Sequence, residues 1–161
     1  MSTWKKYRNL QASLQEFLAA QAITDNVKDL EETSITIRVG RKDATFTLTT
    51  ISVYFESETS KRFETGSNLR DDKQLMIIDI YAKNEADRLD LAKWVVDSIN
   101  DGWQYYTYSN DSVVPDNPAK VIGKKVNVDF LTNGRVKLGD NIDQFDAHRH
   151  QITITARING V

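Results

Sequence analysis

The chain has 161 residues, of which 40% are hydrophobic and 27% charged, and its formal net charge is -2. This composition is typical of one globular domain spanning residues 1–161 rather than of a disordered chain. The nearly balanced charge gives no reason to expect tight non-specific binding of nucleic acid or anionic lipid. Because cysteine is absent, the sequence excludes disulfides, thiolate metal sites and a cysteine nucleophile.

The sequence also lacks the features of an exported or membrane-spanning chain. Its first residues are polar rather than the apolar run of a secretory signal. The strongly apolar stretch at residues 75–78 is broken at Asp79, far short of the ~20 residues that cross a bilayer. We therefore expect an intracellular protein without a membrane segment.

The first predicted elements are a helix and two strands. Apolar residues recur at three- and four-residue steps over residues 4–20, which predicts an amphipathic helix with Thr3 as its cap. Alternating apolar residues predict strands over residues 35–39 and 45–55, joined by a hairpin turn at residues 41–43.

A long polar segment follows at residues 56–73 and is predicted to be a surface loop. Loops of this length in compact domains are usually functional or mobile. Its larger side chains, Arg62, Phe63 and Arg70, are therefore our candidates for contact with a neighbouring ring or protomer.

Residues 75–82 predict the most apolar strand, in the centre of the sheet. Alternation places Met76, Ile78, Ile80 and Ala82 on one face and Leu75, Ile77, Asp79 and Tyr81 on the other. Helices would cover one face, and another subunit is a candidate cover for the second. Leu75, Ile77 and Tyr81 are therefore further interface candidates.

The next segments predict a capped helix and an aromatic strand. Asn84 has the character of a helix cap, an apolar stripe that includes Leu89 follows, and Asp101-Gly102 is a stop signal. The run from Trp103 to Tyr108 is typical of a strand. Its aromatic residues favour core packing or a subunit interface, so Trp103 and Tyr105 are interface candidates.

The remaining segments complete a predicted α+β fold. Residues 109–120 hold both prolines and predict a loop. An Asn133-Gly134 turn between apolar runs predicts a hairpin, and residues 152–158 alternate as a final strand. The expected architecture is a mixed, mostly antiparallel sheet with two main helices packed on one face and long polar loops.

Candidate chemistry is limited, and each candidate has a structural alternative. His148 and His150 could share a strand face and bind a metal with Asp143 or Asp146. The alternative is a solvated pair at the start of an edge strand, because no other histidine or cysteine is available. We favour that alternative, and we expect no metal and no other cofactor.

Two further kinds of site are also disfavoured. The acidic residues Asp71, Asp72 and Asp79 could act as an acid and a base, but nothing in the sequence brings them together. A loop charge pair and a partner-bound Asp79 explain them better. The aromatic run at residues 103–108 could stack on single-stranded nucleic acid, but it lacks interleaved lysine and arginine. We therefore expect no enzyme and no sequence-specific nucleic-acid binder.

The order of elements resembles the tail-terminator, or tail-completion, proteins of long-tailed, non-contractile bacteriophages (siphophages). The resemblance lies in an apolar strand ending in Asp79-Ile80-Tyr81-Ala82, a helix containing Asp87-Arg88-Leu89-Asp90-Leu91-Ala92-Lys93-Trp94, and the aromatic strand Gly102-Trp103-Gln104-Tyr105-Tyr106. It covers residues 75–108 well, and the rest of the chain only by size and element order.

The resemblance implies a structural virion subunit without an active site. Such proteins form a ring, usually hexameric, at the head-proximal end of the tail tube, where they stop tube polymerisation and provide the head-docking surface. The implied partners are further copies of the chain, the tail tube protein and the head connector protein, with DNA passing through the lumen without sequence-specific binding. The expected location is the virion tail, after assembly in the host cytoplasm.

Two alternative functions remain open at this point. A head-side connector, or head-completion, subunit of the neck would share almost all of these sequence features. A small binding module or metal-dependent enzyme using His148 and His150 would instead be monomeric, with a pocket holding perturbed titratable groups.

Overall fold

The computed structural model describes residues 5–27, 35–40, 47–62, 64–66, 70–108, 120–136 and 147–158. Within these residues the chain forms two α-helices and one six-stranded sheet. In chain order, the elements are α1 (Lys6–Thr24), β1 (Thr36–Val39), β2 (Thr50–Arg62), β3 (Arg70–Tyr81), α2 (Glu85–Ile99), β4 (Trp103–Tyr108), β5 (Lys120–Arg135) and β6 (Arg149–Ile158). This arrangement confirms the predicted α+β fold.

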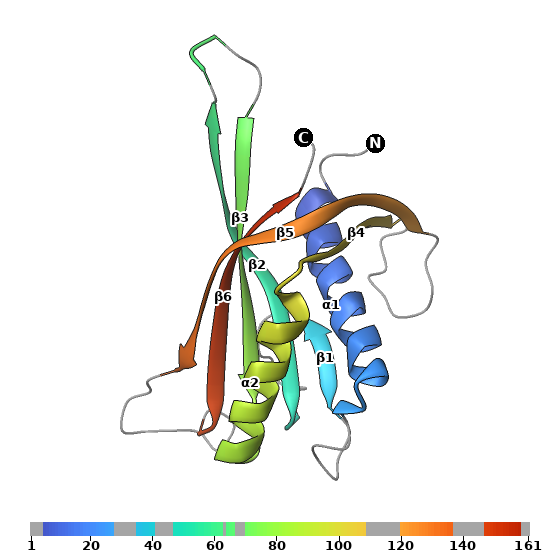
Figure 1. Cartoon of the computed structure of the whole chain (residues 1–161), viewed down its shortest axis with the longest axis vertical. Coiled ribbons are helices and arrows are strands. Elements are labelled where there is room, and N and C mark those ends of the chain that lie inside the picture. Colours follow the sequence, from blue (N-terminus) through green and yellow to red (C-terminus); the bar gives the residue numbers. More distant parts are fainter. Residues whose placement is uncertain are drawn as a thin grey trace.

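The sheet has the strand order β1-β2-β3-β6-β5-β4. The β1–β2 pair is parallel and the other pairs are antiparallel. Strand β3 therefore lies inside the sheet, as its apolar sequence predicts. Both helices lie on the same face of the sheet (Figure 1), where α1 contacts β1, β2 and β4 while α2 contacts β3 and β6. None of the described helices is long and apolar enough to cross a membrane.

The core lies between the helices and the central strands. The predicted face of β3 is confirmed, because Met76, Ile78 and Ile80 are fully buried. The matching face of the neighbouring strands and the inner face of α1 are also fully buried, and they supply Ile51, Val53, Ile152, Ile154, Leu10, Leu14 and Leu18. Burial of these aliphatic side chains is the main force that holds the helices on the sheet.

Local signals set the ends of α2 correctly. The side-chain oxygen of Asn84 accepts a hydrogen bond from the backbone N–H of Asp87 at 2.9 Å, which confirms Asn84 as the N-cap. The helix ends at Ile99, shortly before Gly102. The first two residues of the predicted apolar stripe are out of phase, because Ala86 is exposed and Leu89 is 51% exposed while Leu91 is buried.

The start of α1 differs from the prediction. The helix begins at Lys6, with Lys5 at the N-cap position and no side-chain capping hydrogen bond, and it continues to Thr24. The predicted cap, Thr3, lies outside the described residues. Buried leucines on one side of α1 outweigh the missing cap, because packing contributes more to a helix in a protein than capping does.

The predicted hairpin between the first two strands is wrong. Thr36 of β1 pairs with Thr50 of β2, and Val39 pairs with Val53, in parallel register. The proposed turn at residues 41–43 lies outside the described residues. The sequence shows two adjacent apolar runs but not their relative direction, which depends on how both pack against α1.

The predicted Asn133-Gly134 hairpin is also wrong. Strand β5 runs without a break to Arg135, and Asn133 and Gly134 pair with Ile152 and Gln151 of β6. Both residues are therefore extended, because the ladder with β6 outweighs the local turn preference. Of the predicted loop at residues 109–120, residues 109–119 lie outside the described residues, and Lys120 is the first residue of β5.

The sheet curves around α1, so that strands at opposite ends of the strand order both contact this helix. The free edge of β4 meets α1 at Ser13, whose hydroxyl accepts a hydrogen bond from the backbone N–H of Tyr106 at 2.9 Å. The same hydroxyl donates to the carbonyl of Asn9 at 2.7 Å. This contact covers a strand edge that would otherwise be free to pair with other chains.

Candidate subunit-interaction surface

Within the predicted polar loop at residues 56–73, the described residues 57–62 and 70–73 belong to a two-stranded ribbon. Strands β2 and β3 remain paired from Ser57↔Leu75 to Arg62↔Arg70. Figure 1 shows this ribbon, residues 57–62 and 70–75, projecting beyond the helices; we call it the arm. Its polar residues alternate without an apolar face, and therefore hydrophobic periodicity could not reveal the two strands.

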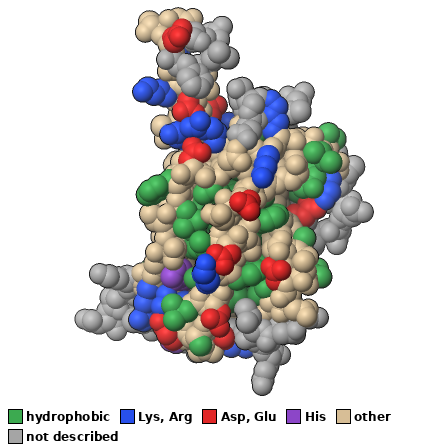
Figure 2. All heavy atoms as spheres, in the orientation of Figure 1, with side chains coloured by type: hydrophobic (Ala, Val, Ile, Leu, Met, Phe, Trp, Pro, Cys, Tyr) green, Lys and Arg blue, Asp and Glu red, His purple; other side chains and the backbone are tan. Residues whose placement is uncertain are grey.

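The outer end of the arm carries two opposed arginines. Arg62 and Arg70 are cross-strand partners, and both are exposed. Arg70 Nε donates a hydrogen bond to Ser60 Oγ at 2.5 Å, and Ser60 in turn contacts Asp72. Both basic and acidic side chains lie on the arm in Figure 2. Like charges directly opposite each other destabilise a strand pair, so the two arginines destabilise the outer end of the arm in the free chain.

The third arm candidate, Phe63, lies outside the described residues. The other two, Arg62 and Arg70, lie side by side on exposed strand positions rather than on a loop. Both arginines are therefore accessible at the outer end of the arm, and their contact with another subunit stays a prediction.

The base of the arm is attached to α1 through Glu58. Lys6 Nζ lies 2.7 Å from Glu58 Oε2, and Tyr7 OH donates to Glu58 Oε1 at 2.9 Å. Gln74 Nε2 also donates to Glu58 Oε2 at 2.7 Å. Partial burial raises the pKa of Glu58, but the hydrogen bonds from these three residues outweigh it and lower the pKa below its ordinary value. The arm is thus attached at one end and exposed at the other.

The sheet face opposite the helices holds the second group of interface candidates. Leu75 and Ile77 are half-buried there, and no described helix covers them. Tyr81 is only 2% exposed and lies under Arg149, whose guanidinium is 5.2 Å from the ring centroid. Leu75 and Ile77 therefore offer surface to a partner, while Tyr81 offers almost none.

Asp79 is the centre of a hydrogen-bond network on this face. It is 2% exposed and accepts hydrogen bonds from Tyr54 OH at 3.1 Å, Arg149 Nη2 at 2.9 Å and Gln151 Nε2 at 3.2 Å. The expectation that Asp79 is bound by partners is confirmed. Such a network fixes the positions of three neighbouring strands. Asp71 pairs instead with Arg157, at 3.2 Å.

The aromatic candidates of β4 belong to the core. Trp103 is 1% exposed and Tyr105 is 8% exposed, which leaves them little area for another subunit in this conformation. Of the two explanations left open for the aromatic run, core packing describes these residues. Tyr108 is also buried, and its hydroxyl donates to Glu16 of α1 at 2.5 Å.

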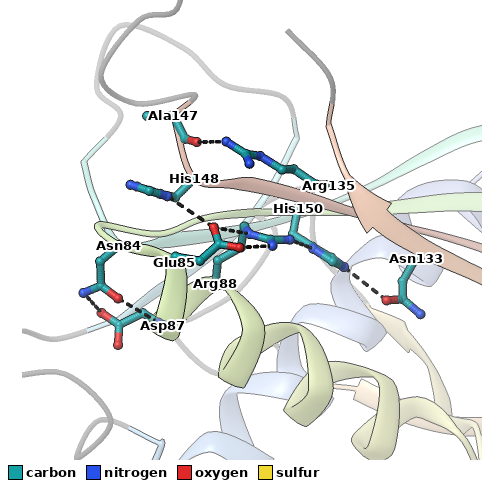
Figure 3. Close-up of polar contacts among 9 residues, drawn as sticks. All are labelled: Asn84, Glu85, Asp87, Arg88, Asn133, Arg135, Ala147, His148 and His150. Atoms are coloured by element: carbon teal, nitrogen blue, oxygen red, sulfur yellow. Dashed lines mark hydrogen bonds and ion pairs between the residues drawn. The ribbon is translucent and has the colours of Figure 1, made fainter.

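The histidines lie at the α2 end of β6 (Figure 3). His150 Nδ1 is 2.5 Å from Arg88 Nη1, and His150 Nε2 is 3.2 Å from Asn133 Oδ1. An arginine can only donate, so Nδ1 accepts and Nε2–H donates to Asn133. Arg88 is held by Glu85, at 2.5 Å from Nη2 to Oε1. His148 Nδ1 lies 3.6 Å from Glu85 Oε2.

This geometry does not fit the proposed metal site. Both nitrogens of His150 already have partners, and the Arg88 cation beside the ring would repel a metal ion. The remaining candidate ligands, Asp143 and Asp146, lie outside the described residues. The expectation of an edge strand is also wrong, because β6 lies between β3 and β5.

The electrostatics of this cluster favour a neutral histidine. The pKa of His150 lies below its ordinary value of 6.5. Burial is the largest cause of this lowering, and the positive charge of Arg88 is the second. Hydrogen bonds from Arg88 are the main cause that lowers the pKa of Glu85 to about 2. The cluster is therefore a neutral imidazole beside an ion pair, an arrangement that joins α2 to β6.

Comparison of the chain with models of protein families and with curated proteins finds no match. The residues that carry the sequence resemblance, 75–108, extend from β3 through α2 to β4.

Proposed function

We propose that this chain is a structural subunit of a ring at the head-proximal end of a bacteriophage tail tube. In this role the ring stops tube polymerisation and provides the surface on which the head docks. The observation that carries the proposal is the arm, which ends in the exposed pair Arg62 and Arg70. The sequence resemblance of residues 75–108 to tail-terminator proteins supports the same role.

The arm suits a contact with another protein for two physical reasons. A two-stranded ribbon without an apolar face is marginally stable by itself, so it gains stability when a partner covers it. The opposed arginines repel each other in the free chain, and an acidic group on a partner would relieve that repulsion. The arm therefore favours a bound state with an anionic surface between or beside the two guanidinium groups.

A ring also explains how growth of a tube ends. A contact between two different surfaces of identical subunits produces a ring when the rotation closes and a filament when it does not. In the proposed ring, which we expect to be hexameric, one rim binds the tail tube protein and the other binds the head connector protein. DNA passes through the lumen without sequence-specific contacts. The mature protein is then part of the virion.

The test is electron microscopy of particles from the phage that encodes this chain. The double variant Arg62→Glu/Arg70→Glu is compared with a deletion of the gene and with Arg62→Lys/Arg70→Lys, which keeps both charges. We expect overlong, headless tubes in the deletion and in the glutamate variant, and normal tails in the lysine variant.

Other outcomes would change the assignment. Tails of normal length beside tailless, DNA-filled heads would move the protein to the head-side connector. Unaffected virions in the deletion would overturn the assembly role. A normal phenotype in the glutamate variant alone would keep the role but remove the arm from the contact.

A further inference from the structure

Strand β5 exposes an apolar and basic segment at residues 120–125. Val121 and Ile122 are 66% and 72% exposed. Lys124 and Lys125 are exposed too, and neither has an ion-pair partner among the described residues. This segment pairs with β4 on one side, whereas pairing with β6 begins only at Val126. We call residues 120–125 the basic ribbon.

The solvent-exposed side of helix α2 carries an apolar residue together with acidic residues, in contrast to the basic ribbon. Leu89 is 51% exposed there. The exposed acidic side chains of this helix are Glu85, Asp90 and Asp97, and the exposed Asp101 follows just after its end. The exposed cation on this side, Lys93, is neutralised by Asp97 at 2.6 Å. In Figure 2 acidic side chains lie around hydrophobic ones over the part of the surface where α2 runs. We call this surface the acidic face.

The two surfaces belong to different parts of the chain. The basic ribbon is paired to β4, which lies against α1, whereas α2 lies against β3 and β6. In Figure 1 this part of β5 passes across α1, away from α2. One chain therefore offers each surface to the outside, and the two can meet only between copies.

We infer that the basic ribbon of one copy binds the acidic face of the next. Leu89 of one copy and Ile122 of the other would remove apolar area from water. Lys124 and Lys125 would meet the acidic face, where Asp90 and Asp101 have no ion-pair partner among the described residues. Such complementary charge fixes orientation and excludes wrong partners. Because the two surfaces differ, the contact is heterologous and leaves one of each free for further copies.

This inference rests on the proposed ring and names the surfaces that join its subunits. It does not involve the arm, which is left to contact a neighbouring ring. The surfaces can therefore be tested in purified protein, without the tail tube and without any effect of the arm.

The absence of cysteine allows a selective cross-linking test. Leu89→Cys and Ile122→Cys chains, carrying tags of different size, are mixed at high concentration and oxidised with copper phenanthroline. We expect mixed Leu89→Cys/Ile122→Cys dimers to exceed both like-with-like dimers. The chain with both substitutions should give a ladder of cross-linked multimers, because every copy then carries both partners.

Two controls make the result specific. In the first control, Ile23→Cys replaces Ile122→Cys, because Ile23 is 80% exposed and lies outside both surfaces. The Ile23→Cys chain should react with thiol reagents as well as the Ile122→Cys chain does, but it should form few mixed dimers with Leu89→Cys. In the second, Lys124→Glu/Lys125→Glu should lower the mixed-dimer yield about tenfold. Asp90→Lys/Asp101→Lys on the partner should restore it.

Each failure has its own meaning. Mixed dimers no more frequent than with Ile23→Cys would overturn the inferred contact and leave the tail phenotype untouched. Equal yields before and after charge reversal would also overturn it, because the pairing would then not depend on complementary charge. Specific mixed dimers together with normal tails in the gene deletion would keep the contact and reject the tail-end function.

Discussion

His150 and Arg88 are held together in the interior between α2 and β6. Their nitrogens Nδ1 and Nη1 lie 2.5 Å apart, and the two residues are 5% and 6% exposed. A permanent cation therefore touches an imidazole that stays neutral by accepting its hydrogen bond. Protonation of His150 would replace this bond with the repulsion of two positive charges, because Glu85 neutralises only one of them.

This relationship predicts that acid destabilises the fold through His150. Because the pKa of His150 is lowered in the folded chain, the unfolded chain takes up its proton first, near pH 6.5. The stabilising contribution is complete above that pH and is lost as the pH falls below it. The thermal unfolding midpoint should therefore drop between about pH 7.5 and about pH 5.5. The ion-paired Glu85 acts in a separate window, since its contribution is lost only below its ordinary pKa of 4.5.

The matched variants are His150→Gln and His148→Gln, measured by circular dichroism across the same pH range. His150→Gln can still accept from Arg88 but does not titrate, so its midpoint should change less with pH. In His148→Gln the unfolding midpoint should change with pH as much as it does in the unmodified chain. An unchanged slope in His150→Gln would contradict the prediction.

Two glycines with the same backbone conformation should differ in their tolerance of alanine. Gly66 and Gly102 have φ values of +86° and +79°. A Cβ on Gly66 meets nothing within 4 Å, but one on Gly102 would lie 2.0 Å from the carbonyl oxygen of Val126. Gly66→Ala should cost about 1–2 kcal/mol of unfolding free energy from backbone strain alone. Gly102→Ala should cost at least about 3 kcal/mol. Urea denaturation measures both, and equal losses would refute the predicted clash.

Removal of the α2 cap should destabilise the chain moderately. Asn84→Ala removes the acceptor for the Asp87 N–H, and we expect a loss of about 1 kcal/mol in unfolding free energy. Asn100→Ala at the other end is the control. Asn100 is exposed and has ordinary helical φ and ψ angles, so Asn100→Ala should lower the unfolding free energy only slightly. Chemical denaturation compares the two, and a larger loss for Asn100→Ala would contradict the assignment of the cap.

The arm should be more stable when one arginine changes sign. Arg62→Glu places a carboxylate opposite Arg70, so repulsion becomes attraction and unfolding free energy should rise by about 0.2–1 kcal/mol. Arg62→Lys, which keeps the repulsion, should leave it unchanged. Hydrogen exchange of the arm amides is the most direct measurement. Faster exchange of these amides in Arg62→Glu would show that repulsion between the opposed arginines does not destabilise the free arm.

Local chemistry was sufficient for several elements. The cap at Asn84 joins residues three positions apart, so the sequence contains both partners. The alternation in residues 75–82 predicted that Met76, Ile78 and Ile80 share one face of β3, because successive side chains of a strand point to opposite faces. The two-faced alternation of β6 was equally clear.

Pairing between distant segments was not predictable in the same way. The arm has no apolar face, and its strands exist because residues 57–62 align with 70–75. Asn133 and Gly134 favour a turn locally, but β6 holds them extended. The direction of β1 relative to β2 likewise depends on packing rather than on either sequence alone.

The candidate surface shows the same division. The sequence placed Arg62 and Arg70 on an exposed segment, and Leu75 and Ile77 on the face of β3 opposite the helices. It could not separate them from Trp103 and Tyr105, since an aromatic side chain suits a core and an interface equally well. It also missed the basic ribbon and the acidic face.

Exposure of those two surfaces has no local signature. Leu89 continues an apolar helical pattern, and Val121 and Ile122 resemble any buried strand residues, yet all three are exposed. The sequence by itself determined the helices, the central strand and the chemistry available at each position. The tertiary structure alone decided strand direction, the arm and which apolar residues remain outside, because these depend on free energies shared between segments far apart in the chain.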